Sequence, residues 1–168
     1  MGVKIPVTIR WQIRRDMAEV LDIEHESFDV PWCEEDFLGC LRERNCIGMV
    51  AETGSKIVGY MLYELYKSRL EILNFAVHSE YRRRGIGRQM FEKLSAKLSQ
   101  QRRSEIVLAV RESNLPAQLF FQRCGFVATG VLKRHFEDCG DDGDVSEDAY
   151  RMLFRKEWEE ADEVRLLG

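Results

Sequence analysis

The chain has no long hydrophobic run, and its cysteines follow no paired spacing. No stretch of its 168 residues approaches the roughly 18 apolar residues of a membrane-spanning helix. The N-terminus lacks the charged and then apolar profile of a signal peptide. The five cysteines are an odd number without metal-ligand spacing, at Cys33, Cys40, Cys46, Cys124 and Cys139. We therefore expect a reduced, cytoplasmic protein with no membrane partner and no metal site.

An excess of positive charge is also missing. The net charge of −4 argues against general binding to nucleic acid. With 45% hydrophobic and 32% charged residues, the composition suits one globular domain with a substantial core. Nothing in it indicates an oligomeric state. Much of the positive charge is concentrated in one segment and in the helix expected after it, at Arg82, Arg83, Arg84, Arg88, Lys93 and Lys97.

That basic segment, residues 81–88, reads Tyr-Arg-Arg-Arg-Gly-Ile-Gly-Arg and follows an apolar strand-like run over residues 71–77. A helix is expected next, with Phe91, Leu94 and Leu98 at helical spacing. A strand that turns through glycines into a helix presents backbone N–H groups and the positive end of the helix dipole to an anion. Glycine permits close approach, and arginine pairs with phosphate oxygens. The segment therefore predicts a pyrophosphate-binding loop, against the simpler interpretation of a solvated basic turn.

The remaining pattern is typical of a mixed α/β chain. Asp16 with Glu19 three residues later has the form of a capping box at the start of a first helix. A Gly-Ser turn at residues 54–55, between two apolar runs, predicts a hairpin. The acidic segment Glu137–Asp148 contains glycines but lacks the ligand spacing of a calcium loop, so we expect a flexible surface turn there.

Two motifs in order make the chain resemble the GNAT superfamily of acetyl-coenzyme A-dependent N-acetyltransferases. The phosphate signature of that family is Gln/Arg-x-x-Gly-x-Gly/Ala, and it is met by Arg82, Gly85 and Gly87. The second signature is a strand, then Ser-Asn, a short helix and Gly-Phe, and it is met by Ser113, Asn114, Gly125 and Phe126.

The likeness is strongest to the branch of bacterial ribosomal-protein-alanine N-acetyltransferases, and it extends from about Ile9 to Phe154. The resemblance implies an α/β fold of the α+β type in one GNAT domain, residues 1–156, followed by a charged C-terminal tail, residues 157–168. It also implies a central, mostly antiparallel sheet flanked by helices, whose fourth and fifth strands splay apart to receive the cofactor.

The same resemblance implies where acetyl-CoA would bind. The backbone of Phe75, Ala76 and Val77 would lie along the acetyl and pantetheine arm as an added strand does. Asn114 would bond the pantetheine region. The pyrophosphate would be wrapped by backbone N–H groups and guanidinium groups of Arg83, Arg84, Gly85, Ile86, Gly87 and Arg88. For Phe75 and Val77, simple core packing is the alternative role.

Proton transfer is the part of the chemistry that the resemblance does not supply. In the ribosomal-protein branch, a glutamate before Ser-Asn is the general base and a tyrosine before Gly-Phe is the general acid. The matching positions here are Ala109 and Phe121, and neither side chain can carry a proton. Glu71 lies where histone-acetylating members of the family place their base, and strand alternation predicts that it shares a face with Leu73, Phe75 and Val77. The alternative is an exposed glutamate at the start of a strand.

Contacts to the acceptor are implied at two places. Phe28, Pro31 and Trp32 fall where related enzymes hold the first residues of a peptide, although an aromatic-proline loop also serves as a hydrophobic staple between helices. The peptide-gripping Tyr-Tyr pair of the family corresponds to His135 and Phe136, which keep stacking and apolar contact without the two hydroxyl groups.

An N-terminal α-amine is the acceptor that this site suits best. With a pKa of about 7.7–8.0, an α-amine is roughly a fifth to a third neutral at pH 7.4, whereas a lysine near 10.4 is only about 0.1% neutral. A site with little proton-transfer machinery therefore favours α-amines. The first hypothesis is a protein Nα-acetyltransferase. The alternatives are an acetyltransferase of small amines such as polyamines, and an acyl-CoA-binding module without catalysis.

Overall fold

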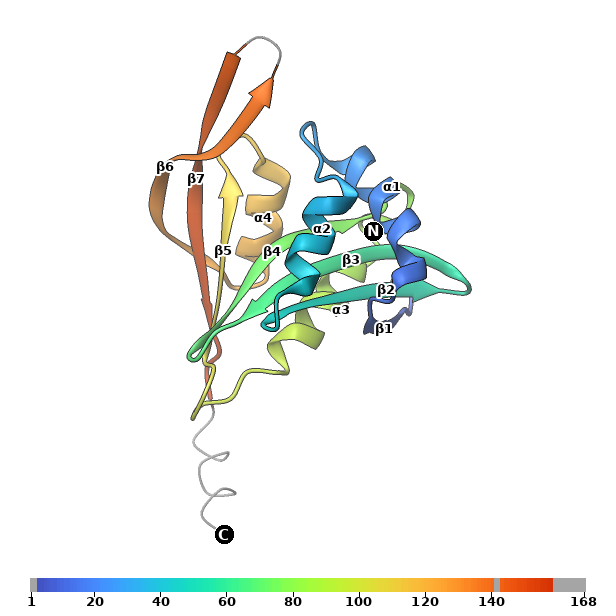
Figure 1. Ribbon diagram of the computed structural model, residues 1–168. Coiled ribbons are helices and arrows are strands. Elements are labelled where there is room, and N and C mark those ends of the chain that lie inside the picture. Colours follow the sequence, from blue (N-terminus) through green and yellow to red (C-terminus); the bar gives the residue numbers. More distant parts are fainter. Residues whose placement is uncertain (1–2, 141–142, 159–168) are drawn as a thin grey trace.

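The computed structural model describes residues 3–140 and 143–158, without the side chains of 138–140 and 143–145, and it is built on one seven-stranded sheet (Figure 1). The strand order is β1-β2-β3-β4-β5-β7-β6, and every neighbouring pair is antiparallel except β4 and β5. The predicted mostly antiparallel sheet is confirmed. The strands are β1 (Thr8–Trp11), β2 (Cys46–Thr53), β3 (Lys56–Leu65), β4 (Arg69–Val77), β5 (Glu105–Arg111), β6 (Val127–Gly140) and β7 (Gly143–Arg155).

Helices cover both faces of the sheet. Strand side chains alternate between two hydrophobic clusters, so that Met61 packs on one face and Tyr60 and Leu62 on the other. One cluster contains buried residues of α3 (Ile86–Ser95) and α4 (Leu115–Arg123). The other contains buried residues of α1 (Met17–Ser27) and α2 (Glu34–Arg42). We call these the α3–α4 face and the α1–α2 face.

Strands β4 and β5 pair over only part of their lengths. Arg69–Ile72 of β4 pairs with Glu105–Leu108 of β5, and the pairing then stops. Strand β4 continues to Val77 along β3, and β5 continues to Arg111 along β7. Figure 1 shows the two strands moving apart at their carboxyl ends. The predicted splay of the fourth and fifth strands is therefore confirmed.

A β-bulge lies in β4 at the point where the strands separate. Leu62 of β3 pairs with Asn74, and Tyr63 pairs with Ile72, so Leu73 is an extra residue. As a result, Ile72 and Phe75 both pack on the α3–α4 face. Glu71 precedes Ile72 and lies on the α1–α2 face. The prediction that Glu71 shares a face with Leu73 agrees with this arrangement, whereas the prediction that it also shares the face of Phe75 and Val77 is wrong, because the bulge resets the alternation between them.

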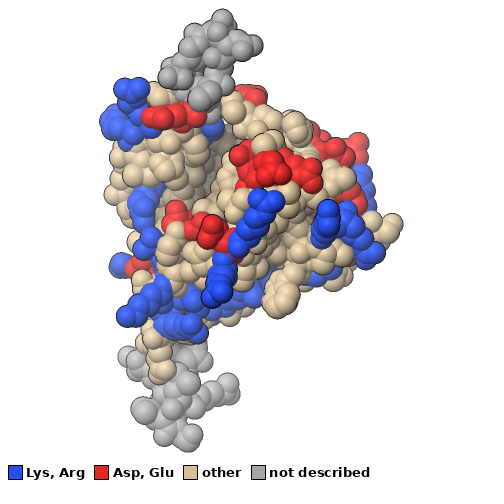
Figure 2. Space-filling view, viewed as in Figure 1, with Lys and Arg blue, Asp and Glu red and all other residues tan. Residues whose placement is uncertain are grey.

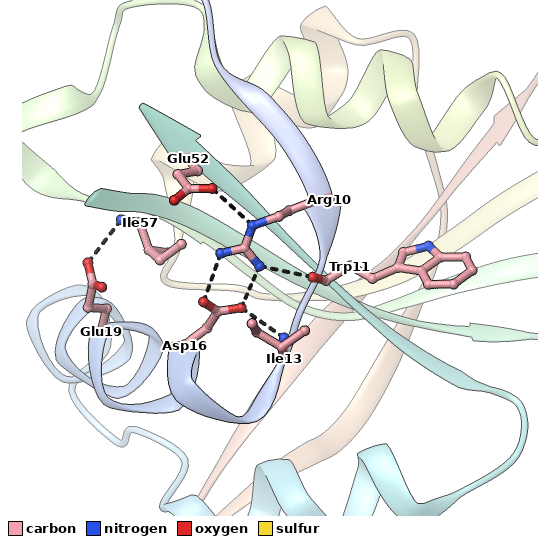
Figure 3. A network of polar contacts seen from close by, with 7 residues as sticks. All are labelled: Arg10, Trp11, Ile13, Asp16, Glu19, Glu52 and Ile57. Carbon is pink, nitrogen blue, oxygen red and sulfur yellow. Dashed lines mark hydrogen bonds and ion pairs between the residues drawn. The ribbon is translucent and has the colours of Figure 1, made fainter. Parts of the chain in front are cut away.

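Polar contacts fix the N-terminal strand to the first helix (Figure 3). The guanidinium of Arg10 donates to both carboxylate oxygens of Asp16, at 2.8 and 2.9 Å, and to Glu52 at 2.9 Å. Asp16 also accepts from the backbone N–H of Ile13, which opens a 3-10 turn ahead of α1. Glu19 accepts from the N–H of residue 57 instead of forming a capping box with Asp16, so that prediction is wrong. The hydrogen bonds from Arg10 hold the pKa of Asp16 below its ordinary value of 3.8.

We expect Asp16→Asn to lower the free energy of unfolding by about 1–3 kcal/mol at pH 7, because Asp16 is only 3% exposed and its donors would lose a charged acceptor. A carboxylate whose pKa is lowered by folding stabilises the protein above its unfolded pKa, and this stabilisation is lost as pH falls through the folded pKa. Urea unfolding of both proteins should therefore show a gap that narrows as pH falls below about 4.

Glu35→Gln is the matched control for Asp16→Asn. Its carboxylate lies 3.8 Å from Arg42, and both side chains are exposed. A surface pair of this kind contributes about 1 kcal/mol or less. Equal losses of stability in the two variants would contradict the structural role of the Arg10–Asp16 contact.

The last two strands form a long hairpin, so the flexible turn predicted at Glu137–Asp148 is wrong. Phe136 pairs with Glu147, and pairing continues to Gly140 with Gly143, while residues 141–142 lie outside the described residues. An irregularity before Phe136 includes Arg134, whose φ is 51° and whose N–H donates to Asp148 at 2.8 Å. The hairpin thereby places Phe136 above the separated strands.

The charged tail predicted from residue 157 lies largely outside the described residues, which end at Trp158. Trp158 packs against the hydrophobic cluster of the α3–α4 face. The boundary between domain and tail stays a prediction. Within the described residues, no helix has the length and apolar character needed to cross a membrane.

Candidate active site

A cavity of about 140 Å³ lies where β4 and β5 separate. Three parts of the chain that are distant in sequence meet there: the α1–α2 connection, the two separated strands and the β6–β7 hairpin. In Figure 2 the surface is hollowed between the hairpin and the helices α1 and α2. The lining residues are Glu24, Phe28, Val30, Trp32, Ile72, Leu73, Asn74, Phe75, Leu108, Ala109, Val110, Arg111, Asn114, Ala117, Phe121 and Phe136.

Several residues that the sequence singled out meet in this cavity. Phe28 and Trp32 line it from the α1–α2 connection, and Phe136 lines it from β6. Asn114 lies at the N-terminal cap of α4, where its side-chain oxygen accepts from a backbone N–H at 3.2 Å. The ring of Phe75 lines the cavity and packs on the α3–α4 face.

Three of the predicted residues lie beside the cavity and do not line it. Pro31 precedes Trp32 and is half-buried. His135 is exposed, and its ring stands edge-on to Phe136 with the ring centres 4.9 Å apart. Glu71 lies in the paired part of β4, where its carboxylate is 3.8 Å from the guanidinium of Arg69.

The predicted phosphate loop has backbone geometry that suits an anion. Arg83 and Gly85 have positive φ values of 60° and 76°, and α3 begins directly afterwards at Ile86. Within the described part of the chain, the backbone N–H groups of residues 83–88 have no hydrogen-bond acceptor. These donors lie at the positive end of the α3 dipole, so the segment can receive several phosphate oxygens.

Gly87, in the first turn of α3, packs closely against two aromatic rings. A Cβ atom at this position would lie 3.1 Å from ring atoms of Phe120 and 3.5 Å from the ring of Phe75. The two rings therefore fill the side of Gly87 on which a side chain would project, and glycine lets the first turn of α3 pack against them. Glycine at this position also keeps the start of α3 free of a side chain beside the N–H groups that suit the pyrophosphate.

The arginines of the loop divide into two groups. Arg82 donates to the carbonyl of Val77 and to the hydroxyl of Ser27, both at 3.0 Å, and so holds the loop against β4 and α1. Arg88 donates to the carbonyl of residue 123 at 3.1 Å. Arg83 and Arg84 are exposed at the mouth of the loop. Arg82 and Arg88 thus position the loop, and Arg83 and Arg84 face solvent.

One strand edge beside the loop is also open. After Ile72, the edge of β4 that faces β5 has no partner strand among the described residues. This unpaired edge includes the backbone of Phe75, Ala76 and Val77, while Gly59 pairs with Val77 along the opposite edge. An extended ligand can therefore pair with β4 as a short additional strand.

The site contains a carboxylate that the sequence analysis missed. Glu24 of α1 is 1% exposed and lines the cavity. It accepts hydrogen bonds from the backbone N–H of Trp32 and the side-chain amide of Asn74, each at 2.9 Å, and from the hydroxyl of Tyr60. Burial and the neighbouring carboxylate raise the pKa of Tyr60. The signal in the sequence is an acidic residue four positions after Val20, within the apolar stripe of α1.

A second charged group, Arg111, lines the opposite side of the cavity. Its guanidinium lies 3.1 Å from Glu147 and 4.3 Å from the centre of the Phe136 ring. Glu147 also accepts from the N–H of Ser113 at 2.8 Å. The hydrogen bonds from Ser113, together with Arg111, lower the pKa of Glu147. Arg111 thus holds the β6–β7 hairpin at the end of β5.

Ala109 and Phe121 both line the cavity. These are the positions to which the resemblance assigns a base and an acid, so the cavity lacks both groups at those positions. Phe121 is 7% exposed and packs against the rings of Phe75 and Phe120. A packed apolar ring, that of Phe121, therefore stands at the position to which the resemblance assigns the general acid.

The sheet opens between two strands, the helix that follows has unused N–H groups at its N-terminus, and a cavity adjoins both. This arrangement is typical of a transferase that binds an acyl cofactor between two strands. Residues 12–126 match the model of the Acetyltransferase (GNAT) family. The chain belongs to this family. Family membership confirms the predicted resemblance and the enzyme class, an acyltransferase that uses acetyl-CoA.

Similar proteins include two acetyltransferases and one solved structure. An N-alpha-acetyltransferase of Sulfurisphaera tokodaii is 30% identical over 150 residues, which cover 82% of this chain and 86% of that protein. The [ribosomal protein bS18]-alanine N-acetyltransferase of Escherichia coli is 25% identical over 121 residues, covering 72% and 81%. The crystal structure of Ard1 from Thermoplasma volcanium superposes with a TM-score of 0.79 at 26% identity. The match covers 92% of this chain and 100% of the Ard1 chain.

Proposed function

We propose that the protein transfers the acetyl group of acetyl-CoA to the N-terminal α-amine of a protein. The observation that carries this proposal is the shared cavity, which joins the open edge of β4 to aromatic residues of the α1–α2 connection and the β6–β7 hairpin. A cofactor on one side and the end of a polypeptide on the other can meet there. The names of the relatives from Sulfurisphaera tokodaii and Escherichia coli support an α-amine acceptor.

The cofactor would lie along the open edge of β4. In this proposal the N–H groups of residues 83–88 hold the pyrophosphate, with Arg83 and Arg84 beside it. The pantetheine arm pairs with the backbone of residues 75–77 and reaches Asn114. The thioester then lies where the open edge of β4 begins, beside Asn74 and Phe75 of the cavity wall.

The acceptor would enter from the opposite side. Phe28 and Trp32 form one wall for its first residue, and Phe136 forms the other. Pro31 fixes the connection that carries Trp32, and the ring of His135 stands edge-on to Phe136. The aromatic walls bind the peptide through apolar contact and leave its backbone groups to water.

The reaction forms a C–N bond and breaks a C–S bond. The neutral amine attacks the thioester carbonyl carbon, the electron pair of the C–S bond leaves with sulfur, and the amine loses one proton. Glu71 is our candidate for the proton acceptor. It lies on the α1–α2 face, as Leu73 of the cavity wall does, but it does not line the cavity, so the proton would reach it through a water molecule.

The missing acid and the choice of acceptor are consistent with each other. A thiol pKa near 8.5 makes the thiolate a tolerable leaving group without a proton donor. Deprotonating a lysine costs roughly 3.5 kcal/mol more than deprotonating an α-amine at neutral pH. A cavity with apolar residues at 109 and 121 is therefore better matched to α-amines.

We also propose that the reaction takes place in the cytoplasm, with no nucleic acid or membrane partner. Among the described cysteines, Cys33, Cys40, Cys46 and Cys124 are all free thiols. Free thiols are typical of reducing compartments.

The first test of the function is release of CoA thiol from acetyl-CoA against a panel of amines. The panel contains short peptides with Ala, Ser or Met at a free N-terminus, the same peptides blocked at the N-terminus with an internal lysine, and polyamines such as spermidine. We expect turnover only with free N-termini. Turnover only with polyamines would replace the proposed acceptor by a small amine. Binding of acetyl-CoA without turnover of any amine would indicate a module without catalysis.

A further inference from the structure

Glu24 is a buried carboxylate without a cationic partner. Its three hydrogen-bond donors are the amide of Asn74, the hydroxyl of Tyr60 and the N–H of Trp32, and all three are neutral groups. Within the part of the chain that the structure describes, no Lys, Arg or His lies within ion-pair distance of Glu24. A buried charge is costly unless a partner compensates it. A ligand in the cavity is placed to provide that partner.

The geometry leaves room for one more donor. An ionised carboxylate offers about four lone-pair sites. One oxygen of Glu24 accepts from both Asn74 and Tyr60, whereas the other accepts only from Trp32. The second oxygen therefore has an unused site, and Glu24 lines the cavity. The other charged lining residue, Arg111, is already paired with Glu147.

We infer that Glu24 binds the acceptor amine as an ammonium group and places it beside the thioester. This inference rests on the proposed function for the identity of the acceptor. Glu24 extends from α1 into the cavity that Ala109 lines from β5. A carboxylate from α1 thus serves the cavity in place of the one missing at Ala109. The bound ammonium then gives one proton through water to Glu71, the proposed proton acceptor, and the neutral amine attacks the carbonyl carbon.

The same contacts make Glu24 sensitive to the peptide-binding connection. Trp32 donates its backbone N–H to Glu24 and packs its ring edge-on against Phe37. Asn74 follows the bulge residue of β4, beside the strand edge proposed for the cofactor. The carboxylate of Glu24 is therefore held between the two proposed substrate sites, with Trp32 donating to one oxygen and Asn74 to the other. This arrangement explains why a glutamate is buried on the apolar stripe of α1.

The test compares Glu24→Gln with the wild-type protein in steady-state kinetics. We expect KM for the amine to rise about 10- to 100-fold, as for loss of a charge-assisted hydrogen bond, while the Kd for acetyl-CoA stays unchanged. Spermidine is measured beside an Ala-initiated peptide. Both acceptors carry an ammonium group, so we expect KM to rise for whichever of them the enzyme acetylates. If the proposed function fails, spermidine is acetylated in place of the peptide, and the effect of Glu24→Gln on KM is still measurable.

Two further variants separate charge from structure. Asp22→Asn removes the same charge from an exposed position of α1 and should leave both constants unchanged. Glu24→Gln combined with Ala109→Glu restores a carboxylate to the cavity, and we expect it to recover part of the lost amine affinity. An unchanged KM for amines in folded Glu24→Gln would overturn the inference.

A measurement on the wild-type protein covers the case in which Glu24→Gln does not fold. With CoA bound, affinities are compared at pH 6 for an Ala-initiated peptide and its propionyl counterpart, which lacks the amine. The α-amine is almost entirely cationic at this pH. We expect the amine to improve binding at least tenfold. Equal binding of the two peptides would show that no carboxylate in the cavity recognises the ammonium group.

Discussion

Gly87→Glu should abolish binding of acetyl-CoA. The new Cβ atom would lie 3.1 Å from Phe120 and 3.5 Å from Phe75, and because these rings fill that side, the carboxylate would be displaced towards the N–H groups at the start of α3. There it would lie beside the pyrophosphate. Two like charges about 4 Å apart repel by about 4 kcal/mol near a protein surface, which lowers affinity about a thousandfold. Isothermal titration calorimetry with acetyl-CoA measures the loss directly.

Gly39→Glu is the control for this substitution. Gly39 lies on the exposed side of α2, and a Cβ atom there would meet no atom within 4 Å. The control should bind acetyl-CoA as the wild-type protein does. Gly87→Ala adds the Cβ atom without the charge, so we expect it to weaken binding less than Gly87→Glu. Full binding by folded Gly87→Glu would contradict the assignment of residues 83–88 as the phosphate loop.

Glu71→Gln should lower kcat about 100-fold at pH 7, the lower end of general-base effects. The amide keeps the size of the side chain but cannot accept the amine proton. Affinity for acetyl-CoA should stay nearly unchanged, because Glu71 lies in the paired part of β4, before the open strand edge. The loss should shrink towards pH 9, where an α-amine is neutral without help. Initial rates with a peptide acceptor from pH 6 to pH 9 give this profile.

Glu64→Gln is the matched control for Glu71→Gln. Glu64 lies directly opposite Glu71 on β3 and accepts a hydrogen bond from the hydroxyl of Tyr66. Removing its charge changes the same part of the sheet without removing the proposed proton acceptor, so the pH profile should keep its wild-type form. Turnover of Glu71→Gln that equals wild type at every pH would exclude Glu71 from the mechanism.

The parts of the fold that sequence predicted are those encoded locally. The glycines at 85 and 87 and the Ser-Asn pair at 113–114 lie in short segments, and each motif specifies its own turn and helix start. The resemblance then supplied the sheet and its splay. Only the outer part of the β6–β7 hairpin, residues 137–148, was misjudged, because it is acidic and contains glycines, whereas pairing with the opposite strand decides its structure.

Glu24 could not be predicted as part of the site from local pattern. Its donors Tyr60 and Asn74 come from strands 36 and 50 residues further along the chain. A glutamate in an amphipathic helix is ordinarily exposed, and only these distant donors make its burial favourable. The face of Glu71 was misjudged for a related reason, because the bulge at Leu73 depends on pairing with β3.

The extra residue in β4 has a consequence for inheriting roles from related enzymes. A related strand without Leu73 would run in phase with this one up to Ile72 and out of phase from Asn74 onwards. An alignment that places its gap one residue too early or too late would exchange inward and outward positions along part of the strand. Equivalent residues in this strand must therefore be matched by the side of the sheet from which they project. Counting positions along the chain is not enough to identify them.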